Sequence, residues 1–249
     1  MRYLGRLKYS GSHFSGWQIQ PNSSTVQEII EQKLSMLLSS EIKVIGCGRT
    51  DTGVHANDFY LHFDTEKNQI ESSKLKYKLN SVLPSSIAFT ELRKVSSQFH
   101  ARFSAVSREY KYYIKLNKDP FQENSWWVRQ PLDLNSMEIA SKFLFNYEDF
   151  TSFSKLHTDV KTNLCEIIEM NIKNYENTIV ITICANRFLR NMVRAIVGTL
   201  VEIGLGKRNP LEMKSIIESK DRQSAGSSAP AKGLFLNKIK YPSELIEDI

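Results

Sequence analysis

The stretch EIKVIGCGRTDTGVHANDFYLHFDT, residues 41–65, places a glycine-rich loop between two apolar segments. EIKVIGCGRT predicts a short strand that enters the loop, and DFYLHFDT predicts a strand that leaves it. Phe59, Leu61 and Phe63 would share one face of the second strand, because side chains alternate between the two faces. Glycine lets the backbone turn tightly and approach a ligand closely. Asp51 in this loop is therefore either a residue that stabilises the turn or a reactive carboxylate on a rigid loop.

The segments on either side of this loop alternate between strand and helix patterns. Apolar residues in STVQEIIEQKLSMLL fall at i, i+3 and i+4, which predicts a helix capped by Ser24 or Thr25. The other predicted elements of this half are the strand MRYLGRLKYSG, the helix SSKLKYKLNSVL, and the strands SIAFTELRKV and FHARFSA. The order is strand, helix, strand, strand, helix, strand, with a further strand after it. It resembles the ferredoxin-like βαββαβ unit.

A second half with a similar order of elements begins near Ala105. Its predicted elements are the strand SREYKYYIKL, the helix DLNSMEIASKFLF, the hairpin CEIIEMNIKN and NTIVITICAN across the turn YEN, the helices RFLRNMVRAIVGTLVEIGLG and NPLEMKSIIES, and the strand KGLFLNKIKY. The sequence therefore predicts an α+β fold of two ferredoxin-like halves, residues 1–104 and 105–249, with mainly antiparallel sheets flanked by helices.

Composition narrows the class of protein. A hydrophobic fraction of 41% and a charged fraction of 24% over 249 residues are ordinary for a soluble globular chain. The net charge of +6 favours an acidic partner, and nucleic acid is the leading candidate. The cysteines are far apart and lack metal-ligand spacing, which predicts reduced thiols in a cytoplasmic protein. The sequence contains no signal-peptide pattern, no apolar run of membrane-spanning length and no nucleotide-binding glycine motif.

Two groups of residues could carry chemistry. Arg187, Arg190 and Arg194 fall at i, i+3 and i+7 of the long predicted helix, with no acid among them. They form either a solvated helix face or a cationic strip that faces a buried carboxylate or phosphates, and the second reading makes Arg187 and Arg190 candidate RNA ligands. Tyr110 lies in REYKYYI, where core packing is favoured, although aromatic residues beside Lys and Arg also suit RNA recognition.

The segment GRTDTGVHA resembles the catalytic motif of the tRNA pseudouridine synthase A family, in which the pattern is G-R-T-D-x-G-V-H-A. Further stretches resemble the same family in the same order: FSGWQIQPNSSTVQEIIE, LNSVLPSSIAF, FHARFSAVSREYKYYI, FLRNMVRAIVG and DRQSAGSSAPAKGLFL. The matches extend from Tyr3 to Leu236. The chain departs from the usual residues of the family at Thr52, Asp58, Phe59, Ser86 and Cys165.

The resemblance implies a role for each matching residue. Asp51 would be the nucleophile, and Arg49 would help to hold an extruded nucleotide. Tyr110 would stack on the target uracil, Arg194 would pair with the catalytic carboxylate, and Leu234 would contact the base. The family isomerises uridine to pseudouridine at positions 38 to 40 of the tRNA anticodon stem-loop, as a homodimer without a cofactor.

Two alternatives stay open at this stage. The first is an RNA-binding module without catalytic activity, in which Asp51 stabilises the turn. The second is a carboxylate-based hydrolase such as a nucleosidase, which would need a second catalytic carboxylate, with Asp58 and Asp64 as candidates. The synthase predicts base isomerisation, the module predicts tRNA binding alone, and the hydrolase predicts free base released into solution.

Overall fold

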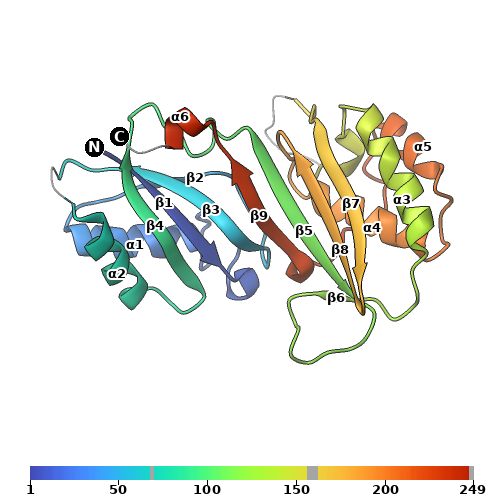
Figure 1. The fold of residues 1–249 in the computed structure, drawn as a ribbon, viewed down its shortest axis with the longest axis horizontal. Helices are drawn as coiled ribbons and strands as arrows, with labels where there is room; N and C mark the ends of the chain where they lie inside the picture. Colours follow the sequence, from blue (N-terminus) through green and yellow to red (C-terminus); the bar gives the residue numbers. More distant parts are fainter. Residues whose placement is uncertain (68–69, 156–161, 247–249) are drawn as a thin grey trace. The chain divides into compact units, whose positions relative to one another are not determined.

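The computed structural model describes residues 1–67, 70–155 and 162–246. The chain divides into two compact units, residues 1–107 with 236–249 and residues 108–235. Each unit combines helices with strands that are mainly antiparallel (Figure 1). The predicted α+β class is therefore confirmed.

The first unit contains the predicted βαββαβ order. Its elements are β1 (Arg2–Tyr9), α1 (Val26–Leu38), β2 (Val44–Gly46), β3 (His55–Asp64), α2 (Ser72–Val82) and β4 (Ile87–Val95). The chain then forms the second unit and returns to the first at Leu236. The first unit therefore also contains most of β9 (Leu234–Lys240) and all of α6 (Ser243–Ile246). β1 pairs antiparallel with both β3 and β4, and β2 pairs antiparallel with β3. α2 packs against both β4 and α1 (Figure 1).

Local sequence patterns account for these elements. The Thr25 side chain caps α1 by accepting a hydrogen bond from the backbone N–H of Glu28, which confirms the predicted start of the helix. Phe59, Leu61 and Phe63 have exposed fractions of 0%, 0% and 1%, so the predicted apolar face of β3 lies in the core. β3 therefore fixes the C-terminal end of the loop that carries Asp51 on a buried strand.

The strand predicted for FHARFSA is wrong, because residues 99–105 form a turn. His100 Nδ1 accepts hydrogen bonds from the N–H groups of Arg102 and Phe103, each at 3.2 Å. Ser104 Oγ accepts a hydrogen bond from the N–H of His100 at 3.0 Å. Side chains within the segment thus satisfy backbone groups that a strand would pair with a neighbour, and the backbone turns instead.

A buried histidine on β3 holds this turn against the sheet. His62 is 1% exposed, and its Nδ1 accepts a hydrogen bond from the N–H of Ala101 at 3.1 Å. Burial, helped by the positive charge of Arg2, lowers the pKa of His62 to about 4. An imidazole that accepts at Nδ1 is neutral, so protonation would remove the hydrogen bond to the turn.

We expect the free energy of unfolding to decrease as the pH falls from about 6.5 to about 4. In this window the unfolded chain binds a proton at His62 and the folded chain does not, so acid favours unfolding. The difference between the pKa of His62 in the unfolded chain, about 6.5, and in the folded chain, about 4, corresponds to a loss of roughly 3 kcal/mol in the free energy of unfolding. Urea denaturation at pH 7 and pH 4 measures it. His62→Asn keeps an acceptor for Ala101 without a titrating group, and an undiminished pH dependence in that variant would contradict the assignment.

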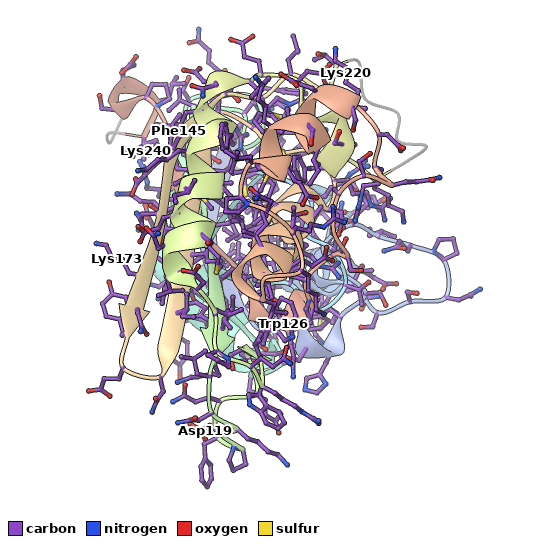
Figure 2. All side chains as sticks on the ribbon, turned by 90° about the vertical axis from the view of Figure 1, so that its right-hand side faces the viewer. Asp119, Trp126, Phe145, Lys173, Lys220 and Lys240 are labelled. Carbon is purple, nitrogen blue, oxygen red and sulfur yellow. The ribbon has the colours of Figure 1, made fainter. Side chains whose placement is uncertain are left out.

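The second unit is built around a three-stranded antiparallel core sheet with helices beside it. Its elements are β5 (Ser107–Lys115), which enters the unit at Arg108, β6 (Trp126–Trp127), α3 (Leu134–Lys142), β7 (Ile167–Tyr175), β8 (Thr178–Ala185), α4 (Met192–Gly204) and α5 (Glu212–Ser219). β8 pairs antiparallel with β5 and β7, while β6 pairs parallel with β5. Figure 2 shows the loop that carries Asp119 between β5 and Trp126. The predicted hairpin is confirmed, because Tyr175 pairs with Thr178 across the turn.

The long helix predicted from Arg187 begins later than the sequence pattern indicates. α4 starts at Met192, and Asn191 before it has φ 67° and ψ 0°. A residue in this left-handed conformation cannot continue a right-handed helix, and Asn adopts it more readily than most residues. Arg187 and Arg190 lie in the connection before α4, so the predicted strip of arginines on one helix face is wrong.

None of the helices formed by the described residues has the length and apolar character needed to traverse a bilayer.

Candidate active site

Asp51 lies in the loop between β2 and β3 and is half-buried. The backbone on both sides of it is hydrogen-bonded to the segment Phe14–Trp17. The N–H of Trp17 donates to the carbonyl of Thr50 at 3.2 Å, and the N–H of Gly53 donates to the carbonyl of Phe14 at 3.4 Å. Because these bonds bracket Asp51, its backbone is held on both sides by the segment Phe14–Trp17.

Two glycines outside the GRTD motif make this close approach possible. Gly16 has φ +88°, and a Cβ on it would lie 2.5 Å from the carbonyl oxygen of Thr50. A Cβ on Gly11 would lie 2.0 Å from the carbonyl oxygen of Val54. By contrast, a Cβ on Gly48, inside the motif, would meet no atom within 4 Å. Neither Gly11 nor Gly16 stands out in the sequence, because their partners Val54 and Thr50 lie far away along the chain.

A hydroxyl and two rings support the loop from within the core. The hydroxyls of Tyr9 and Thr50 are hydrogen-bonded at 2.9 Å. The ring of Trp17 lies on Phe59, with ring centroids 4.1 Å apart, and both side chains are buried. The residue directly before Asp51 is therefore held by its backbone and by its side chain. The sequence did not indicate Tyr9, and it indicated Trp17 only through FSGWQIQPNSSTVQEIIE, one of the stretches that carry the family resemblance.

We expect Gly16→Ala to move the loop, because the new Cβ meets a backbone oxygen and φ is positive. The free energy of unfolding should fall by about 1–3 kcal/mol, and turnover should fall at least about tenfold, because a shift of about 1 Å at a reacting group has large effects. Chemical denaturation measures the first effect, and the rate of the reaction that the site carries out measures the second. Gly48→Ala is the matched control for stability, and an equal loss of stability in both variants would contradict the prediction.

The other carboxylates near this loop in sequence are engaged elsewhere. Asp58 is 4% exposed and accepts hydrogen bonds from Arg6 Nε at 2.6 Å and from the N–H of Ile239 at 3.2 Å. Asp64 forms two hydrogen bonds with Arg2, at 2.9 and 2.7 Å, and these bonds lower the pKa of Asp64. Both acids thus have structural roles, which counts against a hydrolase with a second catalytic carboxylate.

Arg49, two residues before Asp51, is exposed. Cys47, at the start of the same loop, is 1% exposed, and its Sγ accepts a hydrogen bond from the N–H of Tyr60 at 3.4 Å. The interpretation of Cys47 as a small buried residue is therefore confirmed. The loop therefore turns a thiol into the core and a guanidinium toward solvent.

In the second unit, Tyr110 lies on β5 and is half-buried. Its ring meets that of Phe188 edge to face, with centroids 5.2 Å apart and an interplanar angle of 88°. Tyr112 shares this face of the strand, because it is two residues further along. Tyr112 is 0% exposed, its hydroxyl donates to the carbonyl of Pro230 at 2.7 Å, and burial raises its pKa.

Arg194 lies in the first turn of α4 and is bound to the loop before β9. Its Nε donates to the carbonyl of Ala229 at 2.7 Å, and the N–H of Ala229 donates to the carbonyl of Arg194 at 2.9 Å. The guanidinium is close enough to Tyr112 to oppose the effect of burial on the pKa of that hydroxyl. The structure therefore gathers Arg194, Tyr112 and the backbone of Ala229–Pro230 into one cluster, with Tyr110 on the adjoining part of β5.

The other site residues predicted in this unit, Arg187, Arg190 and Leu234, have contacts or exposure of their own. Arg187 Nη1 donates to the carbonyl of Thr162 at 3.1 Å. Arg190 is exposed, and its carbonyl accepts a hydrogen bond from the N–H of Lys155 at 3.0 Å. Leu234 begins β9 and is 5% exposed, so little of its side chain is accessible in this structure.

Comparison with known proteins identifies the family. The sequence pattern of a protein family described as tRNA pseudouridine synthase matches residues 7–104 and 147–242 of this chain. The chain belongs to this family. The match includes the loop of Asp51, all of α4 with Arg194, and Ala229–Pro230, whereas Tyr110 and Tyr112 lie between the two matched stretches. The resemblance that the sequence motifs predicted is confirmed, and the chain is an RNA pseudouridine synthase, an isomerase.

Relatives cover nearly the whole chain. A protein of Bacteroides fragilis is 48% identical over 248 residues, which cover 99% of this chain and 98% of the relative. Proteins of Parabacteroides distasonis and Brevibacillus brevis are 49% and 42% identical, over 99% and 94% of this chain and 99% and 97% of theirs. All of them are named tRNA pseudouridine synthase A. Among solved structures, a chain of a Cbf5-Nop10-Gar1 complex has a TM-score of 0.37 at 12% identity, over 98% of this chain and 50% of that one.

Proposed function

We propose that this chain converts uridine to pseudouridine at positions 38 to 40 of the tRNA anticodon stem-loop, with Asp51 as the nucleophile. The names of its relatives support tRNA as the RNA. The observation that carries the role of Asp51 is its loop, in which hydrogen bonds involving Trp17 and Gly53 hold the residue on both sides. The working form would be a homodimer in the cytoplasm that needs no cofactor.

The reaction breaks the N1–C1′ bond of uridine, turns the uracil and joins C5 to C1′. The hydrogen on C5 leaves as a proton and N1 gains one, so the reaction needs neither an oxidant nor a reductant. Asp51 would attack either C1′ of the ribose or C6 of the base. An ionised carboxylate is a weak nucleophile in water, but a carboxylate held against the reacting carbon gains the large advantage of proximity.

A carboxylate that is removed from water needs a cation beside it, because an unpaired buried charge is costly. Arg194 is the residue we assign to this role. Its Nε is bound to the carbonyl of Ala229, and this bond orients the plane of the guanidinium. A guanidinium beside Asp51 would keep the carboxylate ionised, which is the role that the family resemblance gives to Arg194.

The target base in a stem has to be extruded, at a cost of a few kcal/mol. Tyr110 would recover part of this cost by stacking on the uracil, which is worth roughly 1–3 kcal/mol per base. Leu234 would add an apolar contact to the base, and Arg49 would hold the backbone of the extruded nucleotide. Arg187 and Arg190 would bind phosphates, so binding should weaken as the salt concentration rises.

The test is to incubate the purified protein with unmodified tRNA and to map pseudouridine chemically. We expect new pseudouridine within positions 38 to 40, with no metal, nucleotide or other cofactor added. Uracil released into solution would establish a hydrolase instead. Retardation of tRNA in a gel without any conversion would reduce the protein to an RNA-binding module.

A further inference from the structure

The segment DRQSAGSSAP, residues 221–230, follows the surface of α4 at very short range. The N–H of Gly226 donates to Thr199 Oγ1 at 2.9 Å, and Thr199 is 0% exposed. Gly198 allows the approach, because a Cβ on it would lie 1.7 Å from the carbonyl oxygen of Ser227. The segment, called the α4 loop below, is therefore fixed to the middle of the helix by a buried hydrogen bond and by direct backbone contact.

One side chain closes the α4 loop on itself. Arg222 Nη1 donates to the carbonyls of Ala225 and Gly226 at 3.4 and 3.1 Å, and its Nη2 donates to Ser228 Oγ at 3.0 Å. The acceptors surround a planar guanidinium, which has several donors in fixed directions. A lysine could keep the charge but could not satisfy the same acceptors in the same plane.

The far end of the α4 loop holds Arg194. Ala229 exchanges two hydrogen bonds with Arg194, one to its Nε and one to its carbonyl, and the next carbonyl, that of Pro230, accepts from Tyr112. The bonds to Thr199 and Arg222 restrain the segment that carries the carbonyl of Ala229. That carbonyl accepts from Arg194 Nε, so its position helps to orient the guanidinium.

We propose that Arg222 and Thr199 are positioning residues for Arg194, acting through the α4 loop. The proposal rests on the proposed role of Arg194 beside the nucleophile. Groups at a reacting centre have to be held within a fraction of an ångström, so a displaced carbonyl of Ala229 lowers the rate without weakening RNA binding. The competing assignment for Arg222 is a direct contact to an RNA phosphate, which would affect binding.

Steady-state kinetics separate the two assignments. Arg222→Lys keeps the charge, and Thr199→Val changes no charge at all. Positioning predicts that both variants lower kcat at least about tenfold and leave KM within about twofold of wild type. It also predicts that Arg222→Gln leaves the dependence of binding on salt unchanged. A phosphate contact predicts instead that Arg222→Lys has wild-type kcat. It also predicts that Arg222→Gln lowers the salt slope, which is the slope of the logarithm of the RNA binding constant against the logarithm of the salt concentration, by about one. Either of these results would overturn the proposal.

A second readout does not depend on activity. The Nε–H of Arg194 donates to a part-buried carbonyl, so its exchange with water should be slow in a ¹⁵N spectrum of the full chain. The signal is assigned by its absence in Arg194→Ala. We expect exchange at least about tenfold faster in Arg222→Lys and Thr199→Val, and unchanged exchange in either would refute the proposal. Arg129→Lys, an exposed arginine outside the α4 loop, is the matched control and should change neither the exchange nor kcat.

The two readouts also distinguish the proposal from the function on which it rests. If Arg194→Ala retains full turnover, the role of Arg194 in the reaction is wrong, whatever the exchange data show. If Arg194→Ala loses turnover while Arg222→Lys and Thr199→Val keep both turnover and slow exchange, the function stands and the positioning role is wrong.

Discussion

Asp51→Asn should abolish pseudouridine formation while the protein still folds and binds tRNA. The substitution removes the attacking charge and keeps the shape of the side chain nearly unchanged. Loss of a covalent nucleophile lowers turnover by about 10³-fold or more. The fold should survive, because the bonds that bracket the residue use the backbone of Thr50 and Gly53 and not the carboxylate. Binding should survive because Lys and Arg dominate it.

The measurement follows from the chemistry. C5 of uracil becomes the new point of attachment, so its hydrogen has to leave. Release of tritium from tRNA labelled at uridine C5 therefore reports isomerisation and ignores simple cleavage of the glycosidic bond. We expect release by the wild type and no detectable release by Asp51→Asn, at equal retardation of tRNA in a gel.

Asp64→Asn is the matched control for the loss of a carboxylate from the same unit. Asp64 is paired with Arg2 at the opposite end of β3 from the Asp51 loop, so the variant should release tritium at the wild-type rate. Full activity in Asp51→Asn would make Asp51 a residue that only stabilises its turn. Inactivity of both variants would show that a general loss of structure, and not the loss of the nucleophile, explains the result.

Much of the fold could be predicted because its signals are local. The alternation in β1, the cap of α1 by Thr25 and the turn between β7 and β8 all lie within a few residues of the elements they define. Short-range patterns of this kind depend on periodicity and on side chains that bond to their own neighbourhood. The order of strands and helices along the first unit followed from them.

The errors also have physical causes. Asn191 interrupts the helical pattern of RFLRNMVR by adopting a left-handed conformation, and an Asn alone does not predict such a break, because Asn also occurs inside helices. FHARFSA contains residues with high strand propensity, but His100 and Ser104 bond to their own backbone. In the first segment one backbone angle, and in the second two polar side chains, override the preference of the surrounding residues.

The candidate site could be predicted only as a set of residue types. The contacts that hold it join residues far apart in the chain: Gly16 with Thr50, and Arg194 with Ala229. Periodicity carries no information on such pairs. The sequence therefore indicated Asp51 and Arg194 through motifs, while the contacts of Tyr9 with Thr50 and of Arg222 with the α4 loop became visible only in the structure.

Arg194→Ala should lower kcat by about 10²–10³-fold, because the electrostatic contribution of a charged donor in a water-excluded site is about 3–4 kcal/mol. The remaining activity should depend differently on pH. A cation favours the ionised form of a neighbouring carboxylate, so its removal favours the protonated form, which is not a nucleophile. The acid limb of the pH–rate profile should therefore move to higher pH, and activity should be lost first at the acidic end.

Two further variants decide between a role in the reaction and a contact to RNA. Arg194→Lys restores the charge without the bond from Nε to Ala229, so it should recover part of kcat and return the acid limb toward the wild-type position. Arg190→Ala removes an exposed cation of the preceding turn and should instead raise KM and lower the salt slope of binding by about one, with kcat within about twofold of wild type. If Arg194→Ala behaves like Arg190→Ala, with an unchanged pH–rate profile, both arginines serve the phosphates, and the cation beside Asp51 has to come from another residue.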